Sequence, residues 1–199
     1  MILGLVGSEM CIRDRIDNAV SQKPKGIVIT LPDAAALGKS VKAAIAAGIP
    51  VISMNSGSDD YASLGISAHV GQTEFEAGVG GGQKMKAAGG KKALCVNHEV
   101  GNVALDRRCA GFKKGFGGSV DILGTSNDPT EIQKAVAAKL GGGYDTILTL
   151  GAGLSGEAAL KALEAAGKVG DVRLGTFDMS PNMLKAAAAG KVEFLIDQQ

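Results

Sequence analysis

The stretch GIVITLPDAAALGKSVKAAIAAGIPVISMN, residues 26–55, contains the repeating unit that decides the fold. It opens with a short run rich in β-branched residues, which is typical of a buried strand. Leu37, Val41 and Ile45 then recur at every fourth position and predict a helix that ends at residues 48–50. The run VISMN that follows predicts a second strand. A strand, a helix and another strand in this order indicate a parallel sheet.

The same alternation continues along the chain and predicts the fold class α/β, with parallel sheets covered by helices on both faces. A boundary between two lobes is expected near Thr73, where an extended segment gives way to a helix. The chain then consists of a partial N-terminal lobe at 16–71, a C-terminal lobe at 72–196 and the start of a return to the first lobe at 197–199. Further strands are expected at LGISAHVG, KALCVN, VDILGT, DTILTL, VRLGTF and VEFLI.

The segment LVGSEMCIRDR, residues 5–15, shows neither the period of two of a strand nor the period near four of a helix. All eleven positions resemble the translation of a transposon-end sequencing adaptor. We therefore expect residues 1–15 to be an adaptor-derived scar without regular structure, and the native sequence to begin near Ile16. On this interpretation the natural protein extends past both ends, so the N-terminal lobe is incomplete and the signal peptide is absent from this fragment.

Length and composition exclude several classes of protein. Of the 199 residues, 45% are hydrophobic, which is enough for one large domain or two smaller lobes with packed cores. The net charge is +1 and Lys and Arg do not cluster with aromatic residues, so a nucleic-acid partner is not expected. No apolar run approaches the roughly 20 residues that span a bilayer, which predicts a soluble protein.

The three cysteines and two histidines predict neither a metal site nor a cofactor. His69 and His98 stand alone in the sequence, and isolated histidines usually make structural hydrogen bonds. Cys11 falls in the expected scar, which leaves Cys95 in a predicted strand and Cys109 on the apolar face of the next helix. Two alternatives remain open for this pair: a disulfide formed in an oxidising compartment, or two buried free thiols.

Polar residues follow the predicted strands, and in open α/β sheets ligands bind beyond the carboxyl ends of the strands. Their short carboxylates and carboxamides suit a neutral ligand rich in hydroxyl groups. No Ser-His-Asp arrangement, nucleophile elbow or phosphate loop accompanies them, so an enzyme is not expected. Asn55 and Asn97 also suit turns with unusual backbone angles, which slightly favours a structural role for both. The residues at strand ends are Asp33, Asn55, Asn97, Asn127, Asp178, Asp197 and Gln198.

Helix capping separates these polar residues further. Asp33 and Asp128 occupy positions typical of helix N-caps, so we expect them to be structural. Asp178 differs, because Ser180 and Pro181 already supply the cap and the first residue of the helix that follows it. From the residues alone, a ligand-binding role for Asp178 is as plausible as a structural one.

The predicted helix VALDRRCAGFKKGF, residues 103–116, brings one of its two adjacent arginines near the strand ends. At about 100° per residue, Arg107 points away from the buried stripe, whereas Arg108 lies on the edge of that stripe. A guanidinium there offers its five N–H donors to sugar oxygens or to a carboxylate, so we expect Arg108 to reach a ligand. The buried stripe is expected to consist of Leu105, Cys109, Phe112 and Phe116.

One motif points to a different class of protein. Gly151, Gly153 and Gly156 have the G-x-G-x-x-G spacing of dinucleotide-binding sites, and Asp178 ends the next predicted strand. The motif normally opens a nucleotide-binding domain, but here it is followed by only one strand before the chain nears its end. No residue nearby suits the role of catalytic acid or base in hydride transfer. An NAD-binding oxidoreductase is therefore only the third interpretation.

Five segments together resemble the type I periplasmic sugar-binding proteins of ABC transporters, the ribose-binding-like family. They are AAGIPVISMNSG, HVGQTEFEAG, CVNHEVGNVALDRRCAGF, LGTFDMSP and FLIDQQ, and the likeness extends over 16–199. The resemblance implies two doubly wound lobes that close over one ligand. It assigns direct ligand contacts to Asn55 in the first lobe, Arg108 and Asp178 in the second and Gln198 at the hinge, with Asn97 and Asn102 in support.

The resemblance implies a receptor that captures a monosaccharide or related polyol in an interlobe cleft and delivers it to a membrane permease. It also implies a periplasmic monomer without catalytic activity, cofactor or metal. The second interpretation is the effector-binding domain of a repressor-type transcriptional regulator, since such domains share this fold. Several relatives carry Asp-Arg where this chain has Asn55 and Ser56, so the residues leave the particular sugar open.

Overall fold

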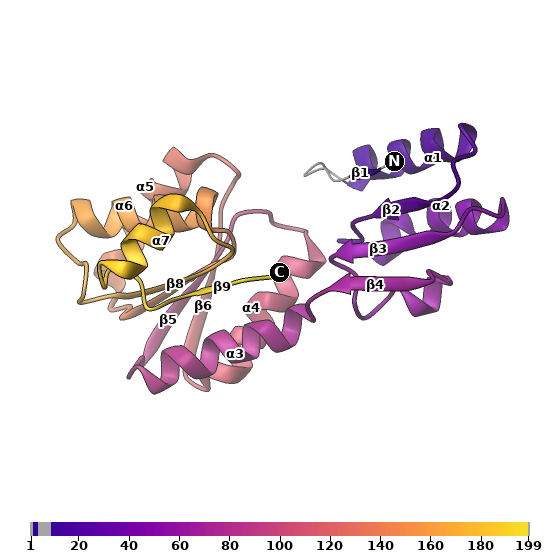
Figure 1. Cartoon of the computed structure of the whole chain (residues 1–199). Coiled ribbons are helices and arrows are strands. Elements are labelled where there is room, and N and C mark those ends of the chain that lie inside the picture. The colour runs from indigo at the N-terminus through magenta and orange to yellow at the C-terminus, as the bar shows by residue number, and fades with distance from the viewer. Residues whose placement is uncertain (1, 4–8, 199) are drawn as a thin grey trace. The chain divides into compact units, whose positions relative to one another are not determined.

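The computed structural model describes residues 2–3 and 9–198. Two compact units make up the chain, and each contains a parallel sheet with helices packed on it, which confirms the predicted α/β class (Figure 1). Of the helices in the described part of the chain, none has both the length and the apolar character needed to cross a membrane. Unit 1 comprises residues 1–73 and 102–104, and unit 2 comprises residues 74–101 and 105–199.

The sheet of unit 1 has its strands in chain order, β1-β2-β3-β4, all parallel. Helices α1 and α2 pack on it over a buried apolar cluster that includes Ile27, Leu37 and Val51. The strands are β1 (Ile2–Leu3), β2 (Ile27–Ile29), β3 (Val51–Asn55) and β4 (Ala68–Gly71); the helices are α1 (Glu9–Ser21) and α2 (Ala34–Ala46), with a 3-10 turn at Ala62–Leu64.

Helix α1 overturns the expectation that residues up to Arg15 lack regular structure, because it begins at Glu9. Ile12, Ile16 and Ala19 lie on one side of α1 and are buried against the core of unit 1. Their spacing of four and three residues is that of an amphipathic helix, but only its first member falls inside the quoted stretch. The pattern was missed for that reason. The proposed adaptor origin of residues 1–15 stays a prediction.

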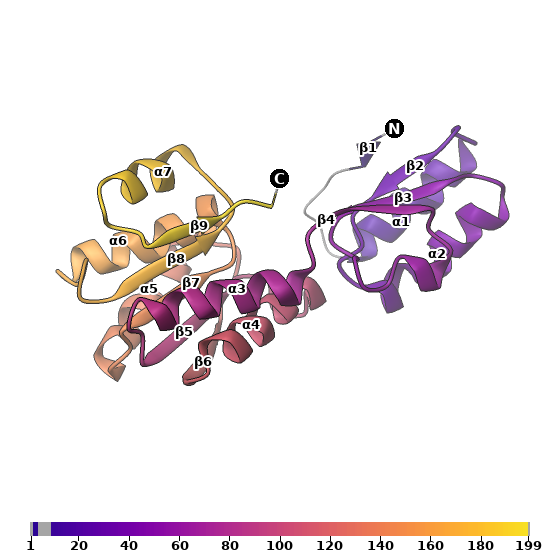
Figure 2. The ribbon, with the colours of Figure 1, turned by 60° about the horizontal axis from the view of Figure 1, so that its bottom comes forward.

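The sheet of unit 2 has the strand order β6-β5-β7-β8-β9, all parallel, with helices on both faces (Figures 1 and 2). Its strands are β5 (Lys92–Asn97), β6 (Ser119–Gly124), β7 (Thr146–Thr149), β8 (Arg173–Phe177) and β9 (Phe194–Ile196). Its helices are α3 (Glu74–Ala87), α4 (Val103–Phe116), α5 (Pro129–Lys139), α6 (Glu157–Ala165) and α7 (Pro181–Ala188), with short turns at Leu140–Gly142 and Ala152–Gly156.

Strand β5 shows how the two faces of this sheet are filled. Leu94 and Val96 point into a cluster shared with α5, α6 and α7, whereas Ala93 and Cys95 point into a cluster shared with α3 and α4. Both faces are therefore apolar, which explains why the strands show no polar alternation. The predicted stripe of α4 is confirmed, since its four members are all buried: Leu105, Cys109, Phe112 and Phe116.

The strand order of unit 2 fixes where a ligand can bind. The chain starts at β5, adds β6 on one side, and then crosses to place β7, β8 and β9 on the other. In a doubly wound sheet the loops after the two strands at this reversal leave the sheet in opposite directions, so a crevice forms at their carboxyl ends. The segments in question begin at His98 after β5 and at Leu150 after β7.

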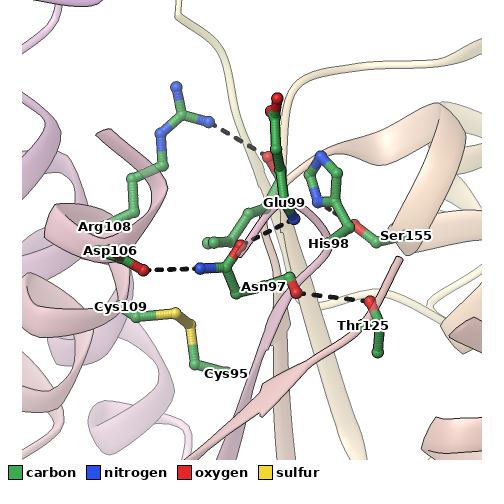
Figure 3. The surroundings of a disulfide bond; sticks show 10 residues. Cys95, Asn97, His98, Glu99, Asp106, Arg108, Cys109, Thr125 and Ser155 are labelled. Carbon is green, nitrogen blue, oxygen red and sulfur yellow. Dashed lines mark hydrogen bonds between the residues drawn. A yellow bond between two sulfur atoms is a disulfide. The ribbon is translucent and has the colours of Figure 1, made fainter. Parts of the chain in front are cut away.

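Cys95 and Cys109 form a disulfide, which resolves the two alternatives left open by the sequence (Figure 3). The bond joins the middle of β5 to the middle of α4, with 5.9 Å between the Cα atoms. Both residues are fully buried in the cluster between α4 and the sheet. Cys11 is exposed and unpaired.

This disulfide should contribute measurably to stability. Because it closes a loop with a sequence separation of 14 residues, replacing both cysteines with alanine should lower the free energy of unfolding by about 3 kcal/mol. Urea unfolding followed by circular dichroism measures the change. Dithiothreitol should produce a similar fall in the unaltered protein and none in the double variant. A free energy of unfolding that reduction leaves unchanged would contradict this expectation.

Candidate functional site

Arg108 lies at the centre of the site and is 4% exposed. Its Nε and Nη2 donate to the two carboxylate oxygens of Glu74, with Nη2 at 3.1 Å from Oε1. Nη1 donates to the carbonyl oxygen of Leu150 at 3.2 Å, just after β7. The guanidinium also lies over the Phe177 ring, 4.6 Å from its centroid. Arg108 therefore joins α3, α4 and the ends of β7 and β8.

Glu74 reaches Arg108 because α3 and α4 approach each other unusually closely, and the two helices run side by side in both ribbon views (Figures 1 and 2). A Cβ on Gly78 would lie 2.3 Å from the carbonyl oxygen of Arg108, and a Cβ on Gly111 would lie 2.0 Å from that of Phe75. Only glycine allows such contact between helix backbones. Glu74 lies one turn before Gly78, so this close packing brings its carboxylate to Arg108.

Gln198 connects Arg108 to Asp178. Its Oε1 accepts from Nη2 of Arg108 at 2.7 Å, and its Nε2 donates to Oδ1 of Asp178. Asp178 follows β8 with a left-handed backbone (φ 66°), and its N–H donates to the carbonyl oxygen of Ile196 at 2.9 Å. The side chain is half-buried. Three of the six residues proposed from the sequence thus form one hydrogen-bonded chain in unit 2.

Asn97 is the fourth proposed residue in unit 2, and it is 2% exposed. Its Nδ2 donates to Oδ1 of Asp106 at 2.8 Å, and its Oδ1 accepts from the N–H of Glu99 at 3.0 Å (Figure 3). Its backbone carbonyl accepts from the N–H of Thr125 at 2.9 Å. These bonds hold the loop after β5 against α4. The geometry suits a residue that shapes the site rather than one that reaches a ligand.

His98 is the next residue of this loop and is half-buried. Its Nδ1 lies 3.4 Å from Oγ of Ser155, which also donates to the carbonyl oxygen of Gly151 at 3.0 Å (Figure 3). Burial lowers the pKa of His98, an effect that the positive charge of Arg108 reinforces and that Glu99 and Asp178 oppose. The imidazole is therefore neutral at neutral pH. Sequence reasoning had expected only a structural role for it.

The other two proposed residues belong to unit 1. Asn55 ends β3 with a left-handed backbone (φ 64°) and an exposed side chain. The unusual backbone angle predicted from the sequence is therefore present at Asn55, whereas Asn97 does not adopt a positive φ. Oδ1 of Asn102 accepts from the N–H of Ala104 at 3.0 Å, in the first turn of α4.

The helix caps predicted from the sequence are confirmed. Oδ1 of Asp33 accepts from two N–H groups at the start of α2, and Oδ1 of Asp128 does the same at the start of α5. These backbone bonds lower the pKa of Asp128. Ser180 caps α7 by accepting from the N–H of Met183 at 3.2 Å, and Pro181 follows it. Asp178 is thus not required as a cap.

The glycine motif after β7 has a local explanation. A Cβ on Gly156 would meet Thr176 and Met183 at 3.1–3.2 Å, and one on Gly151 would meet His98 at 3.2 Å. The motif forms a π-helical turn before α6, and β7 is the third strand of its unit rather than the first. Packing therefore accounts for Gly151 and Gly156 without a dinucleotide.

The side chains of the site offer both hydrogen-bond acceptors and donors. Among the described residues, no group of three or more His, Cys, Asp or Glu is placed to hold a metal ion. Two residues of the candidate site, Glu74 and His98, were not predicted from the sequence. Glu74 could have been noticed only as a carboxylate one turn before Gly78 on a glycine-rich helix face, and His98 only as a side chain directly after a strand.

Comparisons with known proteins show the family and the fold of the chain. The sequence model of the periplasmic binding protein domain matches residues 13–199. The crystal structure of a carbohydrate transporter from Acidothermus cellulolyticus 11B, in complex with myo-inositol, is 33% identical with a TM-score of 0.91; the match covers 96% of this chain and 67% of that one. No curated protein sequence is a significant match.

Two further structures have the same fold. An ABC sugar transporter, a periplasmic sugar-binding protein from Legionella pneumophila, is 25% identical with a TM-score of 0.80, over 93% of this chain and 71% of that one. A periplasmic solute-binding protein of an ABC transporter from Actinobacillus succinogenes 130z, with bound D-allose, is 21% identical with a TM-score of 0.75, over 93% and 68%. At that identity the last structure supports the fold alone.

Proposed function

The chain belongs to the periplasmic binding protein family, and from this premise we propose that it captures a monosaccharide or related polyol. In this proposal it delivers the solute to the permease of an ABC transporter and catalyses no reaction. The myo-inositol bound by the 33% identical relative points to polyols and sugars as the class of candidate ligands.

The observation that carries this proposal is the hydrogen-bonded chain from Glu74 through Arg108 and Gln198 to Asp178. Its residues lie on α3 and α4 and just after β8 and β9, all in unit 2, at the carboxyl end of the sheet where ligands bind in such folds. Carboxylate and amide groups held in fixed positions select a ligand whose hydroxyl groups lie where they can form hydrogen bonds. A neutral polyol suits them because Arg108, the one buried cation among the described residues, is already paired with Glu74.

We assign direct ligand contacts to four residues and supporting roles to two. Asp178 accepts from a ligand hydroxyl through Oδ2, because its Oδ1 already accepts from Gln198. Arg108 uses four of its donors within the protein, so one of its five N–H groups is left for the ligand. Gln198 and Asn55 complete the proposed contacts, while Asn97 and Asn102 hold the loops.

Two features support a periplasmic location. Members of this family that transport sugars are described as periplasmic, and the disulfide Cys95–Cys109 is of a kind that forms and persists in oxidising compartments. We propose that the protein acts there as a monomer, with the sugar and the permease as its partners.

Asp178→Asn tests the proposed contact. Asparagine tolerates the left-handed backbone of this position but replaces a carboxylate acceptor with an amide, so affinity for the cognate polyol should fall about 10- to 100-fold. Isothermal titration calorimetry with myo-inositol, D-allose, D-arabinose and D-ribose measures this. The matched control is Asp171→Asn, an exposed aspartate just before β8, which should bind as the unaltered chain does.

The same titrations discriminate among the interpretations. Binding of a polyol that Asp178→Asn weakens supports the receptor. If the chain bound NAD and none of the polyols, the result would instead favour a dinucleotide-binding protein that uses the glycine motif after β7. Equal affinities of Asp178→Asn and Asp171→Asn would remove Asp178 from the site.

A further inference from the structure

Two hydrogen-bonding atoms lie close to Gly151, just after the end of β7. A Cβ built on this residue would lie 3.5 Å from Nε2 of His98 and 3.6 Å from Oδ2 of Asp178. Both atoms are thus near one point, at the strand reversal of the sheet. Any larger residue at 151 would occupy that point. Because Gly151 has no side chain, none from this position covers the two atoms.

The hydrogen bonds of Ser155 determine which proton His98 carries. The single O–H of Ser155 donates to the carbonyl oxygen of Gly151. Its Oγ must therefore accept in the 3.4 Å contact with Nδ1 of His98, which requires the proton to be on Nδ1. In a neutral imidazole only one nitrogen carries a proton, so Nε2 presents a lone pair. Among the described residues Nε2 has no hydrogen-bond partner.

We propose that His98 is a specificity-determining ligand residue, whose Nε2 acts with Oδ2 of Asp178 to accept hydrogen bonds from two hydroxyl groups of the same polyol. This inference rests on the proposed function and adds a residue that the family resemblance did not assign. Two acceptors side by side select for a ligand with two O–H donors at matching positions. They disfavour a ligand in which either hydroxyl is removed or replaced by an ether.

The proposal makes binding depend on pH. A proton on Nε2 would turn the acceptor into a donor and remove its bond to the ligand hydroxyl. The charged groups that act on His98 are Glu99 beside it in the loop, Arg108 from α4 and Asp178 from the end of β8. Burial and Arg108 lower the pKa of His98 below its ordinary value of 6.5, so the neutral form prevails at neutral pH. Affinity should therefore be constant above pH 7 and fall on acidification, by at most tenfold per pH unit because one proton is involved.

The test uses the full chain, calorimetry at pH 7.5 and 5.0, and the probes myo-inositol, D-allose, D-arabinose and D-ribose. His98→Phe keeps a ring but removes the acceptor, and should weaken the best-bound probe about 10- to 100-fold at pH 7.5. His98→Gln, whose amide oxygen can replace Nε2 as acceptor, should recover part of that loss. Asp178→Asn should still bind more weakly at pH 5.0 than at pH 7.5, because it keeps His98. In His98→Phe and His98→Gln this fall in affinity should be absent.

The outcomes separate this inference from the proposed function. If the unaltered chain binds a polyol and His98→Phe binds it equally well, with the same pH dependence, His98 is not a ligand residue although the receptor function stands. If Phe and Gln at position 98 weaken binding equally, the acceptor role is wrong. If the unaltered chain binds no polyol at either pH, both proposals are overturned together.

Discussion

Replacing Glu74 with glutamine should lower the free energy of unfolding by about 3 kcal/mol or more. The carboxylate is 2% exposed and both of its oxygens accept from Arg108, which is itself 4% exposed. A neutral amide removes the charge that compensates the buried guanidinium and places an N–H group against its donors. The cost is that of a buried charge without its counterion, which exceeds the value of an exposed ion pair several-fold. Urea unfolding monitored by circular dichroism measures it.

Two further variants identify the cause. Glu76→Gln alters an exposed carboxylate in the same first turn of α3, so it should change stability by less than about 0.5 kcal/mol. The double variant Glu74→Leu with Arg108→Met removes both charges and should regain most of the loss, while it abolishes polyol binding. A double variant as unstable as Glu74→Gln would show that packing, rather than the unpaired charge, dominates at this position.

The sequence predicted the layers of this fold because each strand is a short apolar run and each helix carries its own start and stop residues. Asp33, Asp128 and Ser180 act within four residues of themselves, so local patterns sufficed to identify them as caps. Helix α1 was missed because residues 5–15 include only the first of its regularly spaced apolar residues. For the caps and for α1 the information lay in neighbouring residues, so the prediction depended on how long a stretch of sequence was considered.

The site was predictable only in part, for a different reason. Arg108 could be placed near the strand ends because its angle around α4 follows from helix geometry. Whether its guanidinium would be free could not be predicted, since that depends on Glu74 of another helix. The role of His98 likewise depends on Ser155 and Gly151, which are more than fifty positions away in the chain. Contacts of this range follow from packing, not from spacing.

The close approach of α3 and α4 leads to the second large effect. Gly78→Ala would place a Cβ 2.3 Å from the carbonyl oxygen of Arg108, and Gly111→Ala would place one 2.0 Å from that of Phe75. Neither contact can be relieved by rotating a side chain, because the opposing atoms are backbone. The helices would have to separate over the cluster that contains Phe112. Each substitution should lower the free energy of unfolding by about 3 kcal/mol or more.

Gly80→Ala is the matched control, because Gly80 lies on the same helix in an exposed position with no atom within 4 Å of its Cβ. Alanine is a better helix former than glycine, so this variant should be more stable by about 1 kcal/mol. The three variants therefore share one chemical change and differ in the sign of its effect. If Gly78→Ala or Gly111→Ala were as stable as Gly80→Ala, α3 and α4 would not be in backbone contact. The close helix packing would then not explain why the Glu74 carboxylate contacts Arg108, the first contact of the hydrogen-bonded chain to Asp178.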